Sequence, residues 1–289
     1  MAHGLVSERG RPRPRLLTGA KRDEAVARLA RSARRNLMLL DVVASIGRAA
    51  SPYEVPAQAV GAFDGDELCG VVALRPSLVL EAELDEGALD AVLPYVETIE
   101  SGLVKSEASG VELLWRRLAR RGKSAVIDRR EHALAVERGA LRPAPAPLGA
   151  LLRRAAPRDL EALVHAARAS LREEGRPDPF DGDPTGFRRW VRGRLERARV
   201  VERDGRVAFV GYADVRRPEG WLVQGVYTWP EARRTGLAAA GMSAIVEEGF
   251  EAGAGHVQLA VVDGNAPAMS LYAKLGFRPF DTLRTILFA

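Results

Sequence analysis

A run of alternating prolines near the middle of the chain restricts how this sequence can fold. Each proline in the run at residues 143–147 sets its own φ angle and lacks a backbone amide donor. Such a run favours an extended conformation and makes a short, semi-rigid spacer. With 289 residues, the chain also has the length of two ordinary domains. We therefore expect one domain at residues 1–142, a Pro-rich linker at 143–148 and a second domain at 149–289.

Few residues in this sequence suit a disulfide or a metal site. The single cysteine, Cys69, excludes an internal disulfide framework and any zinc or iron–sulfur site with several cysteine ligands. Only four histidines are present, so we do not expect a metal enzyme.

The net charge of +5 does not by itself indicate nucleic-acid binding. Basic residues number 43 and acidic residues 38, and the two kinds are interspersed in both halves of the chain. A nucleic-acid-binding protein would be expected to gather its basic excess on one face. The sequence also has no signal-peptide pattern and no apolar stretch long enough to span a bilayer. We therefore expect a cytoplasmic protein that binds neither nucleic acid nor membrane.

The hydrophobic pattern after the linker predicts the element order β-α-α-β-β-β-α-β-α-β-β. Its clearest local signal is Asp204-Gly205, which favours a hairpin between two strands. A helix over 266–275 is expected to end at Gly276, a typical C-terminal capping residue. The first half follows the same order more faintly, which predicts a duplicated fold. Short strands are expected to close the two halves, at 124–128 and 132–137 in the first and at 277–280 and 283–288 in the second.

The loop after one predicted strand has the features of an anion-binding site. The strand ends at Thr228, Pro230 stops its pairing, and a helix begins near Gly236. Consecutive backbone N–H groups at the start of a helix point into one space, where a pyrophosphate would be stabilised. Arg233 and Arg234 could add charge-assisted contacts to phosphate. The alternative is an ordinary strand–turn–helix connection with two solvated arginines.

A second informative segment begins the later helix. Asn265 suits the N-cap of that helix, and Pro267 suits its first turn. Tyr272 shares a helix face with Met269 and Leu275, so one interpretation makes it a packed core aromatic residue. The other interpretation is a phenol near a bound ligand, able to protonate a leaving group.

Together the two segments resemble the GNAT-type N-acetyltransferase superfamily. The first matches the pattern Arg/Gln-x-x-Gly-x-Gly/Ala through Arg233, Gly236 and Ala238. The second matches Asn-x-x-Ala-x-x-x-Tyr-x-x-x-Gly-Phe through Asn265, Ala268, Tyr272, Gly276 and Phe277. The resemblance implies an α/β fold of the α+β type, with a mixed, mostly antiparallel central sheet flanked by helices. The whole chain is similar to tandem bacterial acetyltransferases in which a degenerate GNAT-like domain precedes the catalytic one.

The resemblance also implies a reaction and a cofactor. An acetyl group would pass from acetyl-CoA to an amine acceptor by direct attack, through a tetrahedral intermediate. The acceptor would be a small molecule, a peptide or a protein. The residues assigned to acetyl-CoA by the resemblance are Val226, Tyr227, Thr228, Arg233, Arg234, Thr235, Gly236, Leu237, Ala238, Asn265 and Ala268.

The resemblance suggests a general acid but leaves the general base open among several carboxylates. Tyr272 would act as general acid for the departing thiolate. Glu173 and Glu174, in a loop that often borders the acceptor site, and Asp214 are candidates for the general base. Each is also the kind of carboxylate that is ordinarily solvated, and Gln224 cannot serve as a base. The alternative function is a non-catalytic protein with the same fold that binds acetyl-CoA or an amine as a sensor.

The first half departs from the pattern where the anion-binding loop would be. It has no Arg-x-x-Gly-x-Gly sequence, and Glu81, Glu83, Asp85 and Glu86 flank the place where pyrophosphate would lie. Their charge disfavours an anion, so we expect that this half lacks the acetyl-CoA loop. It would instead shape the acceptor site or form an interface, and a homodimer is left open.

Overall fold

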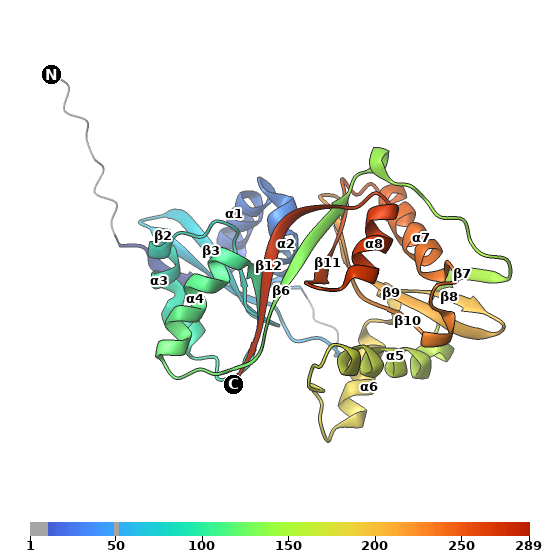
Figure 1. Cartoon of the computed structure of the whole chain (residues 1–289). Coiled ribbons are helices and arrows are strands. Elements are labelled where there is room, and N and C mark those ends of the chain that lie inside the picture. Colours follow the sequence, from blue (N-terminus) through green and yellow to red (C-terminus); the bar gives the residue numbers. More distant parts are fainter. Residues whose placement is uncertain (1–10, 49–51) are drawn as a thin grey trace. The chain divides into compact units, whose positions relative to one another are not determined.

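The structure, a computed structural model, describes residues 11–48 and 52–289 (Figure 1). These residues divide into two units. Unit 1 consists of residues 11–48, 56–128 and 284–289, and unit 2 of residues 52–55 and 129–283.

Unit 1 contains a four-stranded antiparallel sheet in the order β1-β2-β3-β4, with helices on both faces. Successive residues of β2 explain the two covered faces, because side chains alternate along a strand. Ala59 and Phe63 pack with α1 and α2, whereas Val60 and Ala62 pack with α3 and α4. The elements of unit 1 are β1 (Arg13–Leu16), α1 (Gly19–Ala30), α2 (Ala33–Ser45), β2 (Gln58–Asp64), β3 (Glu67–Arg75), β4 (Val79–Leu80), α3 (Glu86–Glu97), β5 (Gly102–Glu107) and α4 (Ala108–Arg120).

Unit 2 is built on the strand order β6-β11-β10-β9-β8-β7. Alternation again covers both faces: Phe209 and Ala213 of β9 pack with α7, and Val210 and Tyr212 pack with α5 and α6. The elements are β6 (Ala125–Val136), β7 (Ala150–Arg154), α5 (Leu160–Glu173), α6 (Pro184–Gly193), β8 (Ala198–Arg203), β9 (Arg206–Arg216), β10 (Trp221–Thr228), α7 (Leu237–Glu251), β11 (Val257–Val262), α8 (Ala266–Lys274) and β12 (Arg278–Phe288). Only β10 and β11 pair in parallel among the pairings within this order. The expected α/β fold with mixed sheets flanked by helices is confirmed.

Two long strands, β6 and β12, each begin in one unit and end in the other. Residues 131–136 of β6 pair antiparallel with the whole of β11 in unit 2. The end of β12 returns to unit 1, where Ile286 and Phe288 are fully buried in its core. The end of β12, from the second half of the sequence, therefore completes unit 1, and the end of β6, from the first half, completes unit 2.

These long strands correct the expectation of short strands at the end of each half. The predicted pairs at 124–128 and 132–137, and at 277–280 and 283–288, are in each case one continuous strand. The gaps between the predicted strands fall on polar residues such as Arg129 and Asp281. They lie within extended backbone instead, because neither strand contains a glycine or an internal turn at that point.

The Pro-rich run at residues 143–147 lies inside unit 2 and packs along α7. The amide of Ala144 donates to Oγ of Ser243 on α7, at 2.9 Å. Pro147 Cγ lies 3.4 Å from where a Cβ on Gly236 would be, at the start of the same helix. The two units divide in sequence between Asp128 and Arg129, within β6 and ahead of the run. Among the described residues, no helix is long and apolar enough to cross a membrane.

Candidate active site

Strands β10 and β11 stop pairing well before either strand ends. Their parallel ladder consists of Trp221 opposite Val257 and Leu222 opposite Gln258, although β10 continues to Thr228. The far edge of β11 stays paired with β6 along its whole length. Beyond Leu222, the edge of β10 that faces β11 has no strand partner in the described chain. Its N–H and C=O groups are therefore available to an extended ligand.

A β-bulge shapes β10 at the place where it leaves β11. Gln224 pairs with Tyr212 of β9, whereas Tyr227 pairs with Val210, so β10 carries one extra residue between them. A bulge turns the strand and redirects its side chains, and bulges are frequent beside active sites. We did not predict this feature from the sequence. Its signal was Gly225, a glycine inside a strand pattern, which has a φ of +57°.

The loop after β10 presents a set of backbone amides that have no acceptor. Gly236 is the N-cap of the 15-residue helix α7, with a φ of +86° that glycine adopts without strain. No side chain caps this helix. Within residues 11–48 and 52–289, the amides of residues 234–239 donate to no acceptor. Free amides at the positive end of a helix dipole stabilise an anion.

The two arginines of this loop differ in what they contact. The guanidinium of Arg233 donates to both carboxylate oxygens of Glu173, at 2.7 and 2.9 Å, and to the carbonyl of Thr228, at 3.0 Å. The hydrogen bond to Glu173 raises the pKa of Arg233. Arg234 is exposed, with a φ of +65°, and its side chain has no partner among the described residues. The arginine available to an anion is thus Arg234, whereas Arg233 ties the loop to α5.

A series of ring contacts connects the Arg233–Glu173 pair to α5. The hydroxyl of Tyr227 donates to Glu173, at 3.3 Å, and burial followed by the charge of Glu173 raises the pKa of this tyrosine. The Tyr227 and Trp229 rings meet edge to face, with centroids 5.3 Å apart. Trp229 in turn stacks on His165 of α5, at 6.3 Å. The end of β10 is thereby packed against α5.

Each carboxylate that the sequence suggested as a base has an arginine partner. Glu174 accepts from Arg129 of β6, at 2.8 Å. Asp214 accepts from Nε of Arg194, at 3.3 Å, and this guanidinium lies 4.1 Å from the centroid of the Tyr212 ring. Glu173, Glu174 and Asp214 are therefore all ion-paired with arginine in this structure. No sequence pattern indicates Arg129, because it lies 45 residues from Glu174 and ahead of the Pro-rich run.

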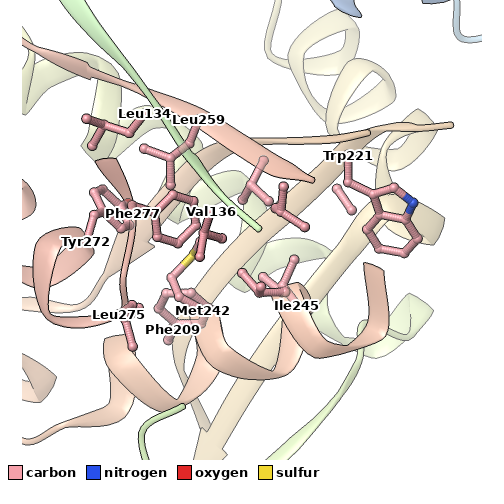
Figure 2. Packing of buried hydrophobic residues seen from close by; sticks show 14 of the residues in the cluster. Leu134, Val136, Phe209, Trp221, Met242, Ile245, Leu259, Tyr272, Leu275 and Phe277 are labelled. Atoms are coloured by element: carbon pink, nitrogen blue, oxygen red, sulfur yellow. The ribbon is translucent and has the colours of Figure 1, made fainter. Parts of the chain in front are cut away.

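The structure places Tyr272 in the core of unit 2, on α8. Its ring lies beside Phe277, with centroids 5.6 Å apart, in the cluster that Figure 2 shows around Phe209 and Met242. Burial raises its pKa, which keeps the phenol protonated at neutral pH. Its hydroxyl makes no hydrogen bond to any residue that the structure describes.

The remaining predicted residues stabilise the start of α8, the start of α7 and the strand before α7. Asn265 caps α8 by accepting from the amide of Ala268, at 3.2 Å. Thr235 donates its hydroxyl to the carbonyl of Ala232, at 2.6 Å. The side chain of Leu237 is buried and anchors the first turn of α7, and Ala238 is half-buried beside it. Val226 packs against the core that α7 covers.

The corresponding strands of unit 1 are arranged differently. Leu78 bridges to Val104 of β5, and the amide of Leu80 donates to Ser106 Oγ, at 2.8 Å, so the strands stay bonded to the end of β4. The following helix α3 is capped by its own Asp85, which accepts from Ala88 at 2.8 Å. A carboxylate therefore occupies the position where an anion would bind in unit 2.

Comparison with known proteins agrees with this arrangement. Residues 160–277 match the model of the acetyltransferase (GNAT) family, whereas no curated protein gives a significant match. Among solved structures, a Drosophila protein has 15% identity, 96% coverage of this chain and 99% of its own, and a TM-score of 0.73. A GCN5-related N-acetyltransferase from Sphaerobacter thermophilus has 18% identity, coverages of 96% and 95%, and a TM-score of 0.59.

The tandem arrangement also has a counterpart among these structures. A tandem GNAT protein from the clavulanic acid biosynthesis pathway has 14% identity, covers 95% of this chain and 98% of its own, and gives a TM-score of 0.56. At such identities the likeness establishes the fold alone. Residues 160–277 thus match the acetyltransferase (GNAT) family model, within a chain whose fold is similar to that of a tandem GNAT protein.

Proposed function

We propose that unit 2 is an N-acetyltransferase that uses acetyl-CoA as donor and an amine as acceptor. The observation that carries this proposal is the combination of an open β10 edge with the unbonded amides of residues 234–239, which follow directly in the chain. One feature suits an extended chain with amide groups and the other a pyrophosphate. Acetyl-CoA contains both.

The donor would be held by backbone more than by side chains. The amides of residues 234–239 would bind its pyrophosphate, and the exposed guanidinium of Arg234 would add a charge-assisted contact. The β10 edge from Val226 to Thr228 would pair with the pantetheine arm. When bound, acetyl-CoA supplies an acetyl group activated as a thioester.

Residues of the chain would then stabilise the negative charge on the thioester oxygen and protonate the departing sulfur. A backbone amide of β10 would donate to the thioester carbonyl and stabilise the negative charge that develops there. Tyr272 would donate a proton to the departing sulfur, because a phenol is protonated at neutral pH and its hydroxyl makes no hydrogen bond within the described residues. The acceptor amine must also lose a proton before it attacks, and Glu173 and Glu174, the candidate bases that the resemblance suggests, are each held in an ion pair by an arginine.

One observation favours a second candidate, a non-catalytic sensor of acetyl-CoA. All the carboxylates suggested as bases, Glu173, Glu174 and Asp214, are paired with arginine. A protein that only binds the donor needs the amide loop and the open strand edge but no proton acceptor. The two functions therefore predict the same donor binding and differ in turnover.

Replacing Tyr272 by Phe separates the two functions. We would measure thiol release with a panel of small amines, aminoacyl compounds and peptides, and acetyl-CoA affinity by calorimetry. The enzyme predicts a loss of about a hundredfold in kcat with unchanged donor affinity, since general acids contribute on that scale. Tyr95→Phe in unit 1 is the matched control and should leave both unchanged. Donor binding with no turnover of any amine would favour the sensor, and absence of donor binding would reject both.

A further inference from the structure

The last residues of α5 are held from two directions. Glu173 is bonded to Arg233 and Tyr227, at the end of β10 and in the loop after it. Its neighbour Glu174 is bonded to Arg129 of β6, and β6 is the strand that pairs with β11. Two consecutive glutamates thus contact the strands on opposite sides of the place where β10 and β11 separate.

The register shows that the second attachment lies at the carboxyl end of β11. Val262, the last residue of β11, is opposite Glu131, and the amide of Asp263 donates to the carbonyl of Arg130. Arg129 follows next along β6 in that direction. Tyr227 lies at the carboxyl end of β10. The end of α5 therefore crosses between the carboxyl ends of two parallel strands, where ligands of open α/β sheets bind.

Further contacts fix each attachment. Arg129 also donates to Glu131, at 3.2 Å, and Glu131 is only 2% exposed, so the guanidinium is anchored to the sheet. Arg233 is anchored by the carbonyl of Thr228, at 3.0 Å. Each arginine thus holds a glutamate at the C-terminal end of α5 beside the carboxyl end of β10 or β11, so both glutamates have a structural role there.

We propose that Glu173, Glu174, Arg129 and Arg233 form a clamp, and that this clamp positions the acceptor side of the site. This inference rests on the proposed acetyl transfer, because an amine must reach the thioester held along β10. The clamp orders the end of α5, and with it the loop that follows, over the separated strands. Arg129 is the positioning residue that no sequence pattern indicated, since it comes from a strand that begins in unit 1.

The first test uses Glu174→Gln, which leaves the Arg129–Glu131 contact in place. Exposed ion pairs contribute little individually, so we expect the KM for the acceptor to rise about threefold with unchanged acetyl-CoA affinity. In the double variant with Glu173→Gln, we expect a rise of about tenfold. Glu161→Gln is the matched control, because Glu161 of α5 accepts from Arg188 at 2.6 Å in another exposed pair. It should leave the acceptor KM unchanged.

A second readout does not require turnover. Hydrogen–deuterium exchange should accelerate at residues 174–176 in the double variant, because the backbone hydrogen bonds of these amides close the last turn of α5. One of them runs from the amide of Arg176 to the carbonyl of Leu171, at 2.8 Å. The Glu161→Gln control should exchange there like the wild type. Unchanged exchange in the double variant would overturn the clamp.

The remaining outcomes separate the clamp from the proposed function. Faster exchange with an unchanged acceptor KM would overturn the positioning role. A fall in kcat of a hundredfold or more with a shifted pH profile would assign proton transfer to the glutamates and overturn it as well. A wild type that turns over no amine would reject the acetyltransferase function, and exchange alone would then decide whether the clamp exists.

Discussion

Replacing Gly276 by Ala should destabilise unit 2 far more than an ordinary glycine substitution does. Gly276 has a φ of +96°, and a Cβ there would lie 2.0 Å from the carbonyl oxygen of Ala140. The segments around Ala140 and Gly276 are kept close by a backbone hydrogen bond, in which the amide of Arg142 donates to the carbonyl of Leu275 at 3.0 Å. The methyl group therefore meets rigid main chain and not the end of a flexible side chain.

The magnitude follows from two separate costs. A side chain in the left-handed region costs about 1–2 kcal/mol, and overpacking against fixed atoms adds about 1–3 kcal/mol. Alanine also lowers the conformational entropy of the unfolded chain, which offsets about 0.4–1 kcal/mol of this destabilisation. We expect a net loss of about 3 kcal/mol in the free energy of unfolding.

Gly253→Ala is the matched control for this prediction. Gly253 has a φ of +89° and no atom within 4 Å of its Cβ position, so it carries the conformational cost without the overlap. Thermal and urea unfolding, followed by the fluorescence of the unit 2 tryptophans, should separate the two variants by about 2 kcal/mol. That difference corresponds to about 4–8 °C in Tm. Equal midpoints would show that the backbone at Ala140 relaxes freely, and the reasoning would be wrong.

Two further predictions test other parts of the fold. Phe288→Ala removes a fully buried ring beside Trp115, at a centroid distance of 6.2 Å, so it should destabilise unit 1 by about 3–5 kcal/mol, as seen by Trp115 fluorescence during unfolding. A loss of stability confined to unit 2 would contradict the placement of the end of β12 in the core of unit 1. Asp159→Asn tests a pH dependence, because the hydrogen bond from Arg153 lowers the pKa of Asp159. The wild-type carboxylate adds about 2 kcal/mol to the free energy of unfolding at pH 7, and this contribution is lost as the pH falls below about 4. In urea titrations, the stability difference between variant and wild type should therefore narrow on acidification. A difference that stays constant with pH would contradict this role of Asp159.

Local sequence signals predicted the local structure well. Asn265 was expected at an N-cap and accepts from Ala268 there, and Gly276 ends α8 as expected. Such signals work because a cap or a turn depends on residues only a few positions apart. The loop that begins α7 was likewise expected from Thr228 to Gly236, because a strand, a proline and a helix start follow one another in the sequence.

What the sequence by itself determined was therefore the kind of elements, their order and the family motifs. The tertiary structure decided which strand ends meet. Alternating apolar residues in β6 and β12 are the same whether a strand stays in its own half or crosses to the other, so periodicity could not reveal the exchange. The early end of the β10–β11 ladder likewise depends on pairing between segments distant in the sequence.

The same reason explains the site's charges. Nothing near Glu173 or Glu174 in the sequence indicates that their partners are Arg233 and Arg129, because long-range ion pairs are set by packing and not by spacing. The sequence suggested two candidate bases in a loop. Only the fold placed each glutamate against an arginine, one on either side of the separated strands.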